Sequence, residues 1–190
     1  MEAQLSFKKI LRQHRDLFAL VEQIEEPVLR SADKLGRTLE SGRKVLVCGN
    51  GGSAADSQHF AAELIGRFEK DRRALPAIAL TTDTSILTAI GNDSGYREVF
   101  AKQVDGLGNK GDVLVGISTS GNSENVLLAV ETARAKGMHT IGLLGNKGGT
   151  LKAAVDIAVV VPHAVTARIQ EVHLFILHFW AGFIEKRIFA

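Results

Sequence analysis

The chain alternates between short apolar runs and helical stretches, and this order constrains its fold more than any other feature. The runs are almost continuously apolar, which is typical of strands covered on both faces of a sheet. Strands that alternate with helices predict right-handed βαβ units, a parallel sheet and a layer of helices on each face. We therefore expect an α/β three-layer sandwich with five strands at 44–48, 77–80, 112–117, 140–144 and 157–161, and helices at 54–67, 124–136 and 166–189.

The first forty residues have a helical pattern instead. Pro27 is placed to open a second helix, where its missing N–H costs little, and Ser41-Gly42 to close it. We divide the 190 residues into a helical arm at 1–42, for oligomer packing, and one structural unit at 43–190. The arm can equally pack on its own sheet, and the sequence leaves both possibilities open. Its apolar side chains recur at spacings of three, four and seven residues: Phe7, Ile10, Leu11, Leu17, Phe18, Val21 and Ile24.

Charge and cysteine content exclude several classes of protein. The formal net charge is +2, so the general basic footprint of a nucleic-acid-binding protein is absent and we expect no nucleic acid partner. Cys48 is the single cysteine, which excludes an intramolecular disulfide and suits the reducing cytosol. Charged residues interrupt the apolar ones near the N-terminus, unlike a signal peptide or a membrane span. We therefore expect a cytoplasmic protein with no membrane partner.

Two loops rich in glycine and hydroxyl groups follow apolar runs and precede helices. They are GNGGS, at 49–53, and STSGNS, at 118–123. In a doubly wound sheet such loops lie at the carboxyl edge, where ligands bind. Glycine lets the backbone approach an anion, and N–H groups at a helix start point toward it. The second loop contains no lysine or arginine, so we expect a monophosphate held by neutral donors rather than a Walker-type triphosphate loop.

The first loop also allows other interpretations. Gly49, Gly51 and Ala54 match the G-x-G-x-x-A pattern of dinucleotide-binding proteins, and Glu69 follows at a suitable distance. Such a match is weak by itself, and glycine-rich turns can be purely structural. Two such loops at one edge favour a site for an anionic small molecule.

Polar side chains on two predicted helices are candidates for chemistry. His59 and Glu63 are four residues apart, which places them on one helix face, where they can bind a divalent metal or act as an acid/base pair. Alternatively, Glu63 is a surface carboxylate paired with Arg67. The last helix carries Gln170 and His178 among apolar residues. They are separated by about 12 Å of helical rise, so both can reach one metal only at full stretch or from different subunits.

One further polar pair, Asn92-Asp93, has two interpretations. It is either a helix cap with turn residues or a wall of the binding pocket. The local sequence does not decide between them.

The motifs together resemble the phosphoheptose isomerases of the sugar isomerase (SIS) domain family. The resemblance extends over essentially the whole chain. It is carried by CGNGGSAADSQHFAAELIGRF at 48–68, GND at 91–93, GDVLVGISTSGNS at 111–123 and TARIQEVHLFILH at 166–178. STSGNS marks the wider family, whereas the combination of His59, Glu63, Gln170 and His178 is more specific to the isomerases.

The resemblance implies a five-stranded parallel sheet of flavodoxin-like topology and a cytoplasmic homotetramer with active sites at subunit interfaces. It implies conversion of D-sedoheptulose 7-phosphate to D-glycero-D-manno-heptose 7-phosphate through an enediol, the first step toward nucleotide-activated heptose for lipopolysaccharide and other surface glycans. It also implies one Zn²⁺ per subunit, and a sugar phosphate as substrate.

The resemblance further implies a role for each matching residue. Glu63 and His178 would transfer protons, and Glu63 would also contact the substrate. The phosphate would be held by Ser53, Ser118, Thr119, Ser120 and Ser123. The sugar would contact Asn50, Gly51, Gly52, Asn92, Asp93 and Gln170, and zinc would be bound by His59, Glu63, Gln170 and His178.

The chain departs from the family pattern at one position. Some members carry an aspartate before the Arg-Ile-Gln of the last helix, where this chain has Ala167 after Thr166. A role for that aspartate cannot be transferred, and we expect Thr166 to cap the helix instead.

Three alternative functions remain at this stage. A related regulator in the family binds the replication initiator protein, but it lacks counterparts of Glu63 and His178, which this chain has. A different sugar-phosphate isomerase or lyase would share the phosphate loops and differ only in its sugar-facing residues. A nicotinamide dehydrogenase would need a catalytic domain for which 190 residues leave little room.

Overall fold

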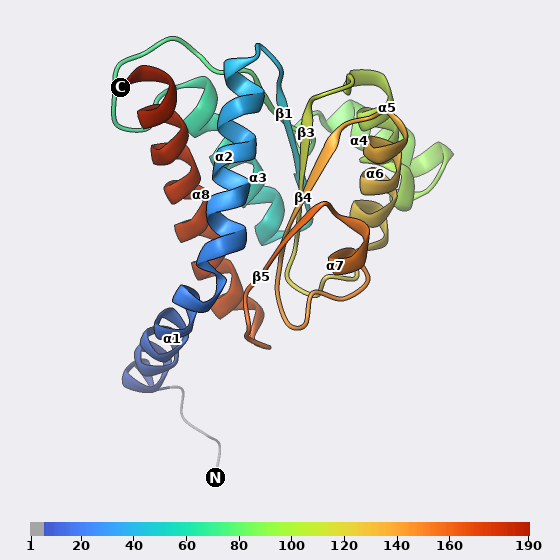
Figure 1. Ribbon diagram of the computed structural model, residues 1–190. Coiled ribbons are helices and arrows are strands. Elements are labelled where there is room, and N and C mark those ends of the chain that lie inside the picture. The colour runs from blue at the N-terminus through green and yellow to red at the C-terminus, as the bar shows by residue number, and fades with distance from the viewer. Residues whose placement is uncertain (1–5) are drawn as a thin grey trace.

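A five-stranded, all-parallel sheet forms the centre of the protein in the computed structural model, which describes residues 6–190 (Figure 1). The strand order is β2-β1-β3-β4-β5. This confirms the predicted fold class and all five strands, with no boundary shifted by more than one residue. The strands are β1 (Val45–Gly49), β2 (Ala77–Ala79), β3 (Val113–Ser118), β4 (His139–Leu144) and β5 (Ile157–Val160).

Helices cover both faces of the sheet, as Figure 1 shows. One layer contains α2 (Glu25–Glu40), α3 (Gly52–Ile65) and α8 (Thr166–Phe189), and the other contains α4 (Thr84–Asp93), α5 (Ala101–Leu107), α6 (Glu124–Ala135) and α7 (Leu151–Ala154). Alternate residues of β1 enter separate cores: Val45 and Val47 face the α8 side, whereas Leu46 and Cys48 face the α6 side. Because both cores exclude water, the central strands β1 and β3 are buried along their whole length.

The N-terminal segment forms α1 (Phe7–Val21), a short 3-10 helix (Glu22–Ile24) and α2. Pro27 lies in the first turn of α2, as predicted. Leu35 and Leu39 of α2 belong to the core of the domain, and Trp180 of α8 donates a hydrogen bond to the Val28 carbonyl oxygen (3.0 Å). By contrast, α1 extends away from the sheet (Figure 1). Residues 1–5 of the predicted arm lie outside the described residues.

The sequence did not predict every helix. The helices α4, α5 and α7 were missed, and the helix α8 begins differently from the expectation. Thr166 is its first residue rather than its cap, since the N-cap is Val165 and no side chain caps the helix. Among residues 6–190, no helix is long and apolar enough to cross a membrane.

Candidate functional site

The two glycine- and hydroxyl-rich loops lie at the carboxyl ends of neighbouring strands. β1 pairs with β2 on one side and with β3 on the other, so the strand order reverses direction between β1 and β3. In parallel α/β sheets this switch point is where ligands bind. Gly51 adopts a positive φ of 57° in the first loop, a conformation that favours glycine. The predicted position of both loops at one edge is confirmed.

The second loop gathers hydroxyl groups that were predicted to bind phosphate. The Ser118 hydroxyl lies 2.9 Å from that of Ser123 and 3.4 Å from that of Ser120. The backbone N–H of Gly121 donates to the Ser118 hydroxyl (3.1 Å). Ser53 is buried in the first turn of α3. The loop thus concentrates neutral donors at the start of α6, an arrangement suited to an anion.

A third loop, at 145–150, supports the second loop from behind and was not anticipated. The Asn146 side chain donates to the Thr119 carbonyl oxygen (2.8 Å), and the Thr150 N–H donates to the Asn122 side chain (3.0 Å). Gly121 packs so closely on Gly148 that a β-carbon on Gly121 would fall 2.1 Å from the Gly148 carbonyl oxygen. Such pairing could not be read from local patterns, because the two loops are about 28 residues apart in sequence.

Asn50 is held by a reciprocal amide pair. Each of Asn50 and Asn125 donates its side-chain N–H to the oxygen of the other at 2.9 Å. The Tyr96 hydroxyl donates to the same Asn50 oxygen (3.3 Å). These three residues line a cavity of about 320 Å³ together with Arg97, Ser123 and Glu124. The cavity adjoins the hydroxyl-rich loop, so the sequence-predicted Asn50 and Ser123 share one hollow.

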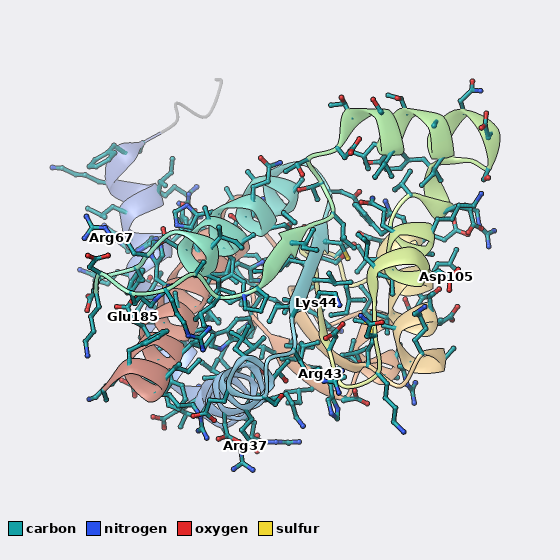
Figure 2. The ribbon with its side chains drawn as sticks, turned by 90° about the horizontal axis from the view of Figure 1, so that it is seen from above. Arg37, Arg43, Lys44, Arg67, Asp105 and Glu185 are labelled. Carbon is teal, nitrogen blue, oxygen red and sulfur yellow. The ribbon has the colours of Figure 1, made fainter. Side chains whose placement is uncertain are left out.

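The clearest chemical constellation is the cluster of His59 and Glu63 on α3 with His178 on α8. The two histidine Nε2 atoms are 2.8 Å apart, and Glu63 Oε1 lies 3.3 Å from His59 Nε2. The His59 and Glu63 side chains are 41% and 22% exposed, which leaves the cluster open to a ligand. Glu63 therefore faces His59 rather than Arg67, whose side chain lies at the periphery in Figure 2. The surface-pair interpretation of Glu63 is wrong.

This cluster has the donor set of a zinc site. One ligand atom from each of the three residues lies within 4.8 Å of the other two. Two imidazoles and a carboxylate are typical zinc ligands. Two ring nitrogens that face one another at 2.8 Å require a shared proton or a shared cation between them. The residues therefore fit the implied metal.

Gln170 contacts the start of α3 within one chain. Its amide sits against Gly52, where a β-carbon would fall 2.2 Å from Gln170 Nε2. Gly52 and His59 are separated by about 10 Å of helical rise along α3. Gln170 thus joins the loop at the start of α3, while His178 joins His59 and Glu63.

Asn92 and Asp93 lie in the last turn of α4 and are exposed. The Asn92 amide donates to the Asp93 carboxylate (2.8 Å). Within residues 6–190, no hydrogen bond or ion pair links either side chain to the two loops or to the His59 cluster. Their part in the pocket therefore stays a prediction.

Two titratable groups on the helices of this cluster have shifted pKa values, and the first of them, the half-buried Asp56, was not anticipated from the sequence. Burial raises the pKa of Asp56 to about 6, although the positive charge of His59 opposes the shift. One Asp56 carboxylate oxygen is buried without a hydrogen-bond partner among the described residues. Burial also lowers the pKa of His173 to about 4, against the effect of its hydrogen bond with the Leu144 carbonyl oxygen (3.1 Å). The signal in the sequence was the spacing of Asp56 three residues before His59, which places the two side chains next to each other on α3.

The dinucleotide interpretation does not fit the fold. Its acidic residue contacts a ribose at the end of the second strand, whereas Glu69 lies in the connection between α3 and β2. The backbone N–H of Glu69 donates to Glu185, away from the first loop. The G-x-G-x-x-A match is therefore coincidental.

Comparison with known proteins agrees with this geometry. The family model of the SIS domain matches residues 11–145, so the chain belongs to the SIS domain family. A phosphoheptose isomerase of Geobacter sulfurreducens is 56% identical over 173 residues, which cover 91% of this chain and 92% of that protein. One of Helicobacter pylori is 52% identical, with coverage of 94% and 93%.

A solved structure gives the same result. The phosphoheptose isomerase of Neisseria gonorrhoeae superposes with a TM-score of 0.90 and 47% identity, covering 94% of this chain and 96% of that one. Within the SIS domain family the chain thus groups with the phosphoheptose isomerases, and it is an isomerase. The comparisons lend no support to the regulator of replication as an alternative.

Proposed function

We propose that this isomerase converts D-sedoheptulose 7-phosphate to D-glycero-D-manno-heptose 7-phosphate in the cytoplasm. The observation that carries the proposal is the Glu63, His59 and His178 cluster, in a chain that is 56% identical to a phosphoheptose isomerase. A carboxylate beside imidazoles suits proton transfer between adjacent carbons. The hydroxyl-rich loop supplies neutral donors for the phosphate.

The reaction needs a base for a carbon-bound proton and a group that moves protons between oxygens. The Glu63 carboxylate removes a proton from C1 of the open-chain ketose, and the C1–C2 enediol forms as the C2 carbonyl oxygen gains a proton. His178 exchanges protons with O1 and O2. Return of the proton from Glu63 to C2, with loss of the O1 proton, gives the aldose. The isomerisation is redox-neutral, so no oxidant or reductant is required.

A divalent metal fits the same cluster. We assign His59, Glu63 and His178 as ligands of one Zn²⁺ per subunit, with Gln170 contributed by a neighbouring subunit. When bound, zinc supplies Lewis-acid polarisation of the substrate oxygens. The location of Gln170 against Gly52, away from His59 in the same chain, supports this division of ligands.

We assign a homotetramer with shared active sites to this protein. Support comes from apolar side chains that a single chain leaves exposed, including Phe7 at 78%, Leu11 at 55% and Phe175 at 48%. A cavity of about 530 Å³ lies among α1, α2 and α8. Asn92 and Asp93 would reach the sugar of an adjoining subunit. Light scattering tests the assembly, and a monomeric mass would contradict it.

The decisive experiment measures turnover of sedoheptulose 7-phosphate by the purified protein. We expect Glu63→Gln and His178→Gln each to lower kcat by at least about 100-fold, because each loses a proton-transfer group. Arg67→Gln is the matched control, since Arg67 is an exposed charge four residues from Glu63 on the same segment. Turnover measured with and without a chelator tests whether the reaction needs the metal. Wild-type protein that fails to convert the substrate, even with added zinc, would overturn the proposal.

Mixing variants tests whether the sites are shared. Glu63→Gln and Gln170→Ala are each expected to be nearly inactive alone. If Gln170 acts in the site of a neighbouring subunit, mixed oligomers contain some sites with both wild-type residues, and activity returns after subunit exchange. If oligomers are shown to contain both variants and activity still does not return, each chain builds its active site alone.

A further inference from the structure

We propose that Arg72 and Glu185 are positioning residues that set the geometry of the His59, Glu63 and His178 cluster. This inference rests on the proposed function, because that function makes the cluster the reacting centre. The pair joins the segment after α3 to the last turns of α8. We call it the α3–α8 clamp. It holds the two helices that carry the cluster at a fixed separation.

Glu185 is buried and fully engaged. Its carboxylate accepts hydrogen bonds from the backbone N–H groups of Phe68 (3.2 Å), Glu69 (3.0 Å) and Lys70 (2.7 Å), and from Arg72 Nε (2.9 Å). The Arg72 and Glu185 side chains are only 2% and 3% exposed. Burial raises the pKa of Glu185, but these hydrogen bonds outweigh it and hold the pKa below its ordinary value. A charged carboxylate thus organises the whole turn that follows α3.

Arg72 acts on the end of α3 that carries Glu63. Its guanidinium donates to the carbonyl oxygens of Glu63 (2.7 Å) and Leu64 (3.0 Å). The last carbonyl groups of a helix lack partners within the helix, and a cation there satisfies them and complements the helix dipole. The backbone of Glu63 itself is therefore bound to a guanidinium that is in turn bound to α8.

The clamp also reaches His178. Glu185 follows His178 by seven residues, which is two helical turns, so both lie on the same face of α8. Glu185 holds the Phe68 N–H, and the Phe68 ring lies 5.9 Å from the His178 ring, centre to centre. Gly182 leaves room for this approach, since a β-carbon there would fall 3.2 Å from Phe68 Cε1. Figure 2 shows Glu185 on α8 beside the segment that follows α3.

Stability alone is a poor explanation for such a pair. Desolvation of two buried charges offsets much of their attraction, so a buried ion pair adds little net stability over an apolar pair of the same shape. Its hydrogen bonds are directional, however, and they run to both elements of the cluster. Polar partners behind a metal or catalytic ligand typically change affinity or activity by 10- to 100-fold when they are removed.

Glu185→Gln tests the clamp with little change in shape. The variant keeps one acceptor oxygen. It replaces the other with an NH₂ group, which cannot accept hydrogen bonds from the backbone N–H groups and Arg72 that face it. We expect kcat to fall at least about tenfold, while KM stays within about twofold, because the phosphate loops lie at the opposite end of α3. Zinc affinity of the chelator-stripped protein, measured by competition with a coloured chelator, should fall by a similar factor. Arg72→Lys keeps the positive charge but loses the simultaneous hydrogen bonds of the guanidinium to Glu185, Glu63 and Leu64. It is the second test variant if Glu185→Gln does not fold.

Arg187→Gln is the matched control. Arg187 lies two residues after Glu185 and joins α8 to α2 through Glu40 (2.9 Å) and Asp33 (3.0 Å), with no contact to the cluster. We expect it to change the unfolding temperature without changing kcat or zinc affinity. A clamp variant that behaves like this control, with lower stability but wild-type kcat and zinc affinity, would overturn the inference. If wild-type protein fails to convert the substrate, the proposed function is wrong, whereas zinc affinity still decides the clamp.

Discussion

Acid should destabilise this protein through His173, and the size of the effect follows from its burial. The His173 side chain is fully buried on α8, and burial lowers its pKa from 6.5 to about 4. Between these pH values the unfolded chain binds a proton that the folded protein does not. The contribution of His173 to the free energy of unfolding is therefore complete above pH 6.5 and lost as the pH falls to 4. At about 1.4 kcal/mol for each pH unit, the loss is about 3 kcal/mol.

The assay is urea unfolding of the chelator-treated protein at pH 7 and at pH 4, at one protein concentration. The perturbation is His173→Gln, because a glutamine amide can still donate to the Leu144 carbonyl oxygen but does not titrate. The variant should be less stable than the wild type at pH 7, yet it should lose about 3 kcal/mol less on acidification. Equal losses in the two proteins would refute the reasoning, because His173 would then titrate as it does in the unfolded chain.

Two further predictions concern the residues around the candidate site. Asp56→Asn should make the free energy of unfolding fall more steeply as the pH is lowered. Because the pKa of Asp56 is raised to about 6, the folded wild type binds a proton between pH 6 and 4 that the unfolded chain does not yet bind. This proton uptake stabilises the wild type by about 1 kcal/mol toward the acid end, after allowance for the partial exposure of the carboxylate. The same urea titration measures this, and an unchanged slope would contradict it. Gly52→Ala should lower kcat/KM about tenfold by displacing the flexible Gln170 amide, with stability changed by less than about 1 kcal/mol. Its effect should not add to that of Gln170→Ala, and additive losses would show that Gly52 acts through another contact.

The five strands could be predicted because each is apolar on both faces, and the loops because they follow those strands directly. The helix α4 could not, because none of its residues is fully buried and only Leu87 and Ile90 pack against the core, too few to define an apolar stripe. The helix α7 has only four residues, too few for a period. Local sequence thus detects long buried segments, and it misses helices that are short or only partly covered, including the seven-residue α5.

The candidate site shows the same division. The spacing of His59 and Glu63 placed them on one helix face, and the structure adds His178 to them. For Gln170 the sequence left open a fully stretched side chain or a second subunit, and the structure places its amide against Gly52 at the start of α3. Arg72 and Glu185 are 113 residues apart, so neither could be recognised as a partner of the other without the fold.

The contacts between α3 and α8 explain why the site depends on the register of two helices. Gln170 meets Gly52, His178 meets His59, and Glu185 meets the segment after α3. The contact partners advance together along both helices, so α3 and α8 run parallel to one another. Parallel helices with matched register keep the phosphate end and the reacting end of the site at a fixed separation. A slip of one residue in α8 rotates its side chains by about 100° and would remove all three contacts together, so the packing that stabilises this layer also aligns the chemistry.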